Sequence, residues 1–338
     1  MPPRPPRPES APGHPRPLAA TPAAERGSDE GKPGDAADCT GRVVARFGQR
    51  YIVALDPSAA EPTGEVDAIA RGRRLSIVVG DRVHCRLEHG LCVIEGFDER
   101  RNLLFRADAN RTKPLAANVD QLAIVFAAQP PPQPEFAWRA LLAARAADIA
   151  PIAILNKIDL ESSAALIALE ELAQLGARAL RLSARADPQA AAAQLRQVCQ
   201  DRVTLFVGQS GMGKSTLLNL LIDSKVRTGA LSRRGTRGRQ TTTLTRWFAY
   251  GPKGALIDSP GFHEFGLGHL SAADLARYMP DLAAESGNCR FANCRHAEEP
   301  DCQVRAAVER GQIRCARYEF YRRLLAQEVR AKASSPRC

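Results

Sequence analysis

Residues 208–216, GQSGMGKST, have the spacing of a loop that binds nucleotide phosphates. Glycines let the backbone pass close to phosphate oxygens, and the amides at the start of a following helix favour an anion. Lys214 would reach the β- and γ-phosphates, and the Ser215 hydroxyl would bind Mg²⁺. The predicted phosphate-binding residues are Gly208, Gln209, Ser210, Gly211, Met212, Gly213, Lys214, Ser215 and Thr216.

A second motif, NKID at residues 156–159, has the residue types that read guanine. The Asp159 carboxylate can accept both N1–H and the exocyclic amine of guanine, donors that adenine does not present in that arrangement. Lys157 can lie over the base, and Asn156 can tie this loop to the phosphate loop. The predicted guanine site comprises Asn156, Lys157, Ile158, Asp159, Ser183 and Ala184. A P-loop ATPase is the alternative, and Asp159 disfavours it.

Asp258 begins a third motif, DSPG, at the end of an apolar stretch. A carboxylate there can hold the water shell of Mg²⁺, and the Gly261 N–H can contact the γ-phosphate. Residues 225–246, between this motif and the phosphate loop, contain seven Lys or Arg and no Asp or Glu. We expect this basic segment to be the first switch and to contact RNA, with a solvated basic loop as the alternative.

The sequence CRFANCRHAEEPDC contains a set of soft metal ligands, Cys289, Cys294, His296 and Cys302. Three thiolates and one imidazole complete a tetrahedral zinc shell and leave no position for a catalytic water. We therefore expect one structural Zn²⁺, with unligated cysteines in a loop as the alternative.

The elements that carry these motifs change character along the chain. Residues 41–97 contain several short β-rich runs separated by turn residues, which is typical of a small barrel; a plain packing domain is the alternative to an oligonucleotide-binding one. From about residue 115 apolar strands alternate with helical segments, which predicts a parallel sheet with ligands at the carboxyl ends of its strands. The phosphate, guanine and DSPG motifs all follow such strands.

The order of the motifs is unusual, because the guanine motif precedes the phosphate loop. A nucleotide site is assembled in space, so joining the old termini and opening the chain elsewhere preserves every contact. The sequence therefore predicts a circularly permuted domain, opened after the DSPGF strand.

With these motifs, residues 40–326 resemble the ribosome small subunit-dependent GTPase A family, circularly permuted GTPases of 30S biogenesis. The resemblance rests on NKID, LSA, GQSGMGKST, TTT at 241–243, DSPGFHEFGL and the cysteine cluster. It implies a multi-domain fold with an N-terminal β-barrel of the OB type, a central α/β P-loop GTPase domain and a C-terminal, mostly α, zinc-binding domain. The expected ranges are 1–38 for a disordered proline-rich tail, 39–110 for the barrel, 111–280 for the GTPase domain and 281–338 for the zinc domain.

The resemblance also assigns residues in the switch. It favours Thr242 or Thr243 as a magnesium ligand beside Ser215 and Asp258, and Thr242 is taken here. Family members commonly have His before the three threonines, where this chain has Gln240, the candidate for positioning water together with Lys214 and Gly261 at the reacting phosphate. Phe262 stands where many GTPases have a water-orienting Gln, so we expect slow intrinsic turnover.

Composition limits the partners. A net charge of +10 favours a polyanion, and the resemblance names the 30S subunit and 16S rRNA, with GTP and GDP as nucleotides. No run approaches eighteen consecutive apolar residues, so we expect no membrane segment. The N-terminus has no apolar signal core, so we expect a reduced, cytoplasmic protein, and we take it to be a monomer. The leading hypothesis is a GTPase of late 30S assembly that the subunit stimulates. The alternative is a nucleotide-gated RNA-binding checkpoint factor whose hydrolysis only resets binding.

Overall fold

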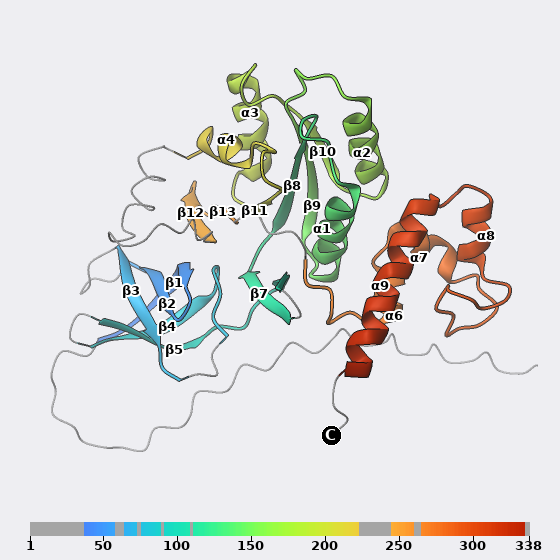
Figure 1. The fold of residues 1–338 in the computed structure, drawn as a ribbon. Coiled ribbons are helices and arrows are strands. Elements are labelled where there is room, and N and C mark those ends of the chain that lie inside the picture. The colour runs from blue at the N-terminus through green and yellow to red at the C-terminus, as the bar shows by residue number, and fades with distance from the viewer. Residues whose placement is uncertain are drawn as a thin grey trace, which may run out of the picture.

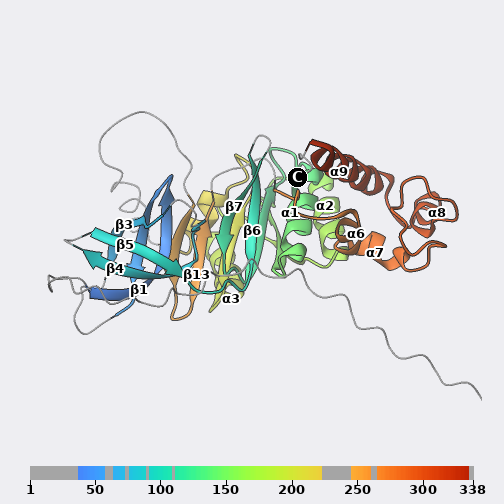
Figure 2. The same ribbon diagram turned by 90° about the horizontal axis from the view of Figure 1, so that it is seen from below.

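The protein is described by a computed structural model over residues 37–57, 64–72, 76–88, 91–108, 111–222, 245–259 and 265–334 (Figure 1). Three parts follow one another along the chain, and Figure 2 shows the α/β part between the barrel and the C-terminal helices. Residues 1–36 of the predicted tail, and Gln240, Thr242 and Gly261, lie outside the described residues, whereas the last two residues of that range, Ala37 and Asp38, belong to the first strand of the barrel. Within those ranges no helix is long and apolar enough to cross a membrane.

The first part is a closed five-stranded barrel. Its strands are β1 (Ala37–Phe47), β2 (Arg50–Leu55), β3 (Glu65–Ala70), β4 (Arg82–Glu88) and β5 (Leu91–Phe97). The order is β1-β2-β3-β5-β4, and β4 pairs again with β1 to close the barrel. Alternate residues such as Val43, Val53 and Ile94 fill its interior. The predicted OB-type barrel is confirmed.

A hairpin joins the barrel to the next part. It consists of β6 (Leu103–Asp108) and β7 (Arg111–Ala117). The Gly266 N–H donates to the Phe105 carbonyl at 3.1 Å, so the hairpin binds the backbone just beyond the DSPG motif.

The central part is a sheet in the order β10-β9-β8-β11-β13-β12. Its strands are β8 (Gln121–Ala127), β9 (Ala150–Asn156), β10 (Arg178–Arg181), β11 (Val203–Val207), β12 (Arg246–Tyr250) and β13 (Gly254–Asp258). All adjacent pairs are parallel except β12 with β13. Four helices pack on this sheet: α1 (Pro134–Ala146), α2 (Ser163–Gln174), α3 (Pro188–Cys199) and α4 (Lys214–Asn219).

Side-chain caps fix where two of these helices begin. The Ser162 side chain accepts the Ala165 N–H at 3.2 Å at the start of α2, and Asp187 accepts the Ala190 N–H at 2.9 Å at the start of α3. Each cap satisfies an amide that has no partner inside its helix. The loops that precede these helices, which carry the guanine motif and Ser183, are thereby held at the carboxyl ends of β9 and β10.

The barrel and the central sheet are one hydrogen-bonded sheet of eleven strands. The connection is antiparallel pairing between β1 and β12, with Ala45 opposite Arg246.

The C-terminal part is helical apart from the cysteine-rich loop. Its helices are α6 (Ala272–Arg277), α7 (Pro280–Ser286), α8 (Gln303–Glu309) and α9 (Cys315–Ser334). Helix α9 packs against α1, where the Trp138 and Phe320 rings lie 5.5 Å apart. Arg317 is 2% exposed, makes two bonds of 3.0 Å to Asp281 and lies over the Trp138 ring. These contacts anchor the C-terminal part to the flank of the central domain.

Candidate nucleotide site and metal cluster

The phosphate loop begins at the carboxyl end of β11 and leads into α4. Two glycines make room for its path. A β-carbon on Gly208 would lie 2.6 Å from the Val125 carbonyl oxygen, and one on Gly213, at φ +88°, would lie 2.2 Å from Asn156 Nδ2. Gly213 therefore needs both the left-handed backbone and the missing side chain.

Lys214 and Asp258 meet beside this loop. The Lys214 ammonium donates to Asp258 Oδ1 at 2.7 Å and to the Ser259 carbonyl. Ser259 is buried, and its hydroxyl donates to the Phe206 carbonyl at 2.8 Å. The carboxyl end of β13 is thereby fixed against β11, with the Asp258 carboxylate next to the phosphate loop. A carboxylate is an oxygen ligand of the kind that Mg²⁺ prefers.

Asn156 connects three loops. Its side chain is 2% exposed, donates to the Met212 carbonyl at 3.1 Å and accepts the Ala184 N–H at 3.1 Å. The Ser183 hydroxyl donates to Asp159 Oδ1. The guanine motif, the phosphate loop and the Ser183 loop are thus held together by one side chain and its neighbours.

Lys157 adds a second connection. It has a left-handed backbone, at φ +61°, and its ammonium donates to the Gln129 carbonyl at 2.6 Å and the Gly211 carbonyl at 2.8 Å. Its side chain is therefore held against the phosphate loop.

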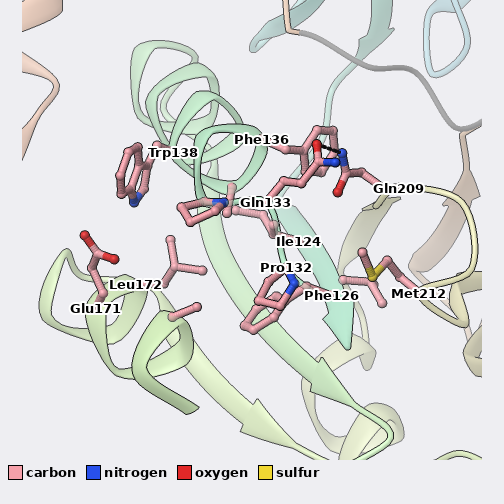
Figure 3. A pocket seen from close by; sticks show the side chains of 14 residues that line it. Ile124, Phe126, Pro132, Gln133, Phe136, Trp138, Glu171, Leu172, Gln209 and Met212 are labelled. Atoms are coloured by element: carbon pink, nitrogen blue, oxygen red, sulfur yellow. Dashed lines mark hydrogen bonds between the residues drawn. The ribbon is translucent and has the colours of Figure 1, made fainter. Parts of the chain in front are cut away.

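A small cavity of about 20 Å³ lies behind the phosphate loop (Figure 3). It is bordered by Gln209 and Met212 of the loop and by Pro132 and Trp138, and the Gln209 amide donates to Gln133 Oε1 at 2.5 Å. Ligand pockets are typically ~300–1,000 Å³, so this space is far too small for a nucleotide. This cavity is therefore not the predicted nucleotide site.

The predicted zinc ligands converge in the C-terminal part. The ligand atoms of Cys289, Cys294, His296 and Cys302 all lie within 4.8 Å of one another. The Cys289 and Cys302 sulfurs are each 3.5 Å from His296 Nδ1 and 4.0 Å from one another. A tetrahedral Zn²⁺ with bonds of ~2.0–2.3 Å needs its ligands about 3.5–3.8 Å apart, so the two sulfur-to-imidazole distances match that ion and the widest separations would shorten by up to ~1 Å around it. The cluster could hold a metal.

The loop that carries these ligands is fixed from two sides. The hydroxyls of Tyr318 and Tyr321 on α9 donate to the carbonyls of His296 and Arg295 at 2.8 and 2.7 Å. The Glu299 carboxylate accepts backbone N–H groups of the same loop. Burial opposes its ionisation, but these bonds outweigh that effect and lower the Glu299 pKa to about 2. The four ligands are therefore oriented by groups that do not bind the metal themselves.

Comparison with known proteins agrees with this geometry. The RsgA GTPase family model matches residues 97–268. The chain belongs to that family. A small ribosomal subunit biogenesis GTPase RsgA from Paraburkholderia phytofirmans is 43% identical over 296 residues, which is 84% of this chain and 92% of the relative. The one from Paraburkholderia phymatum is 41% identical over 318 residues, covering 92% and 96% of the two chains.

Two solved structures share the fold. YjeQ from Thermotoga maritima has a TM-score of 0.62 at 26% identity and covers 87% of this chain and 99% of its own. YloQ, described as a circularly permuted GTPase, has a TM-score of 0.60 at 24% identity and covers 89% of this chain and 98% of its own, which supports the fold alone. This RsgA-family chain is thus a GTPase, a hydrolase that acts on GTP, and the predicted permutation is confirmed.

The proline-rich stretch 129–133 of this RsgA-family chain was not anticipated as part of the site. Its Gln129 carbonyl holds Lys157, and Gln133 bonds to the phosphate loop. A run of three prolines that starts three residues after the end of β8 could have revealed it, because the carboxyl ends of parallel strands share one edge of the sheet.

Proposed function

We propose that this GTPase acts in biogenesis of the small ribosomal subunit, binding the 30S particle and its 16S rRNA and hydrolysing GTP with stimulation by the subunit. The observation that supports the proposal is the arrangement of the parts: the domain that carries the guanine and phosphate motifs is joined by one sheet to a barrel and is followed in the chain by a Cys/His cluster. The net charge of +10 suits an RNA partner, and the relatives are named for this role.

The contacts described above support the roles proposed for Asp159, Lys157 and Lys214, whereas the roles of Thr242, Gly261 and Gln240, which lie outside the described residues, rest on the sequence motifs. Asp159, oriented by Ser183, reads guanine, and Lys157 covers the base. Lys214 would bind the β- and γ-phosphates, and Ser215, Asp258 and Thr242 would hold Mg²⁺, which would supply positive charge to the phosphates. Gly261 contacts the γ-phosphate and Gln240 positions water. The Cys/His cluster binds one structural Zn²⁺. We further propose a cytoplasmic monomer.

GTP turnover with and without purified 30S subunits tests the proposal. We expect turnover to rise at least tenfold with 30S subunits and to stay unchanged with 50S subunits, because Phe262 cannot orient water and the partner must supply or order that group. ATP should not be hydrolysed under either condition. Equal turnover with and without 30S subunits would refute stimulation. Nucleotide-dependent 30S binding without stimulation would instead support the checkpoint alternative.

A further inference from the structure

Arg246 lies at the junction of the barrel with the nucleotide site. On one side of β12 it is paired with Ala45 of barrel strand β1, and on the other side it stands opposite Asp258 of β13. Asp258 in turn holds the Lys214 ammonium. Two backbone pairings therefore separate the barrel from the carboxylate beside the phosphate loop.

The Arg246 side chain makes a second connection to the barrel. Its Nη2 donates to both carboxylate oxygens of Glu65, the first residue of β3. Arg246 is 8% exposed, and its Nε and Nη1 have no hydrogen-bond partner among the described residues. A guanidinium removed from water in this way depends on its ionic partner, so Glu65 fixes where the start of β12 can lie.

A neighbouring contact lies at the same junction. The Arg42 guanidinium of β1 lies over the ring of Trp247, 4.8 Å from its centroid. Trp247 is 8% exposed. Burial lowers the pKa of Arg42, as expected for a cation enclosed between two parts of a protein. Barrel and β12 thus contact one another through two consecutive residues of the strand.

We propose that Arg246 is a positioning residue for GTP hydrolysis: with Glu65 it sets the position of Asp258 relative to the barrel. This rests on the proposed role of Asp258 in holding Mg²⁺. Arg246 of β12 is the residue paired with Asp258 of β13. A displacement of the barrel would therefore move β12 and, through this pairing, Asp258. A partner bound to the barrel thereby acts on the metal side of the site rather than on the guanine side.

The test measures the affinity of a fluorescent GDP analogue in Mg²⁺ and again in EDTA. The ratio of the two dissociation constants reports how well the metal supports the nucleotide, without relying on turnover. Arg246→Met and Glu65→Gln each remove one charge of the Arg246–Glu65 ion pair. The double variant Glu65→Leu/Arg246→Met leaves no unpaired buried charge and guards against a simple loss of folding, which thermal unfolding monitors. The matched control is Glu95→Gln, which removes an exposed ion pair to Arg71 in the same barrel.

We expect both single variants and the double variant to reduce the ratio at least fivefold, with the EDTA affinity unchanged within twofold. Glu95→Gln should match wild type. Asp258→Asn, as a reference, should reduce the ratio by at least as much. If the ratio falls in Asp258→Asn but is unchanged in the Arg246 and Glu65 variants, the positioning role of Arg246 is refuted and the proposed metal role of Asp258 is not. An unchanged Asp258→Asn would also overturn the proposed metal role. Neither result depends on ribosomal subunits.

Discussion

Asn156→Ala should separate three loops that one buried amide holds together. The change removes two hydrogen bonds of 3.1 Å and leaves the Ala184 N–H and the Met212 carbonyl inside the protein. A typical bond contributes ~1 kcal/mol net, and a stranded buried group costs ~1–3 kcal/mol. The free energy of unfolding should therefore fall by ~2–4 kcal/mol.

Part of that loss should appear in nucleotide affinity, because the guanine and phosphate loops must hold their relative positions to bind one ligand. If ~1.4–2.8 kcal/mol of the lost free energy is lost from binding, the dissociation constant for GTP rises 10- to 100-fold. Fluorescence titration with a GTP analogue measures the affinity, and urea unfolding measures the stability.

A matched control lies outside the site. Asn102 makes the same pair of bonds, donating to the Val119 carbonyl at 2.8 Å and accepting the Val119 N–H at 2.9 Å. Asn102→Ala should lower stability with little change in nucleotide affinity. If Asn156→Ala lost stability like the control but bound GTP within twofold of wild type, the bridge between the loops would have no role in binding.

Two further predictions concern the base and the metal. Asp159→Asn should lower the affinity for GTP at least 100-fold and make the protein prefer xanthosine triphosphate. The Asn NH₂ would face the guanine N–H donors, but it can donate to the xanthine carbonyl. Competition titrations with both nucleotides measure the preference, and an unchanged preference for GTP would contradict the assignment. Cys294→Ser should reduce bound zinc, measured by elemental analysis, from about one equivalent per chain to below 0.2. It should also raise the rate of amide hydrogen exchange in residues 287–302, because a structural zinc contributes folding free energy directly. Retained zinc with unchanged exchange would exclude Cys294 as a ligand.

Much of this molecule could be predicted from local sequence. The strand-loop-helix pattern around residues 203–219 and the spacing of Cys289 to Cys302 each depend on residues close together in the chain. The hairpin β6–β7 could not be predicted in the same way. Pro114 stands inside β7, where a proline normally argues against a strand, and the register shifts between Leu104 and Phe105. Its stability comes from pairing with distant backbone, including Gly266.

The same reasoning applies to Arg246. In the sequence it is one of seven cations in a basic segment, all equally suited to a solvated surface. Its burial depends on Glu65 and Ala45, which lie far away in the chain and come close only after the barrel and the central domain have formed. The local sequence pattern contains no signal for the pairing of Arg246 with Glu65.

The eleven-stranded sheet also has a consequence for synthesis of the chain. Ala45 and Arg246 are about 200 residues apart, so at ~5–20 residues per second β1 is made ~10–40 s before β12. The barrel strands are complete at Phe97, and the barrel can close while the edge of β1 that will receive β12 still lacks its partner. An open strand edge invites pairing with other chains. Arg46, next to Ala45, is a cation whose guanidinium donates to the Gly48 and Ile77 carbonyls, so the chain beside that edge carries a charge, which discourages pairing with other chains until β12 emerges.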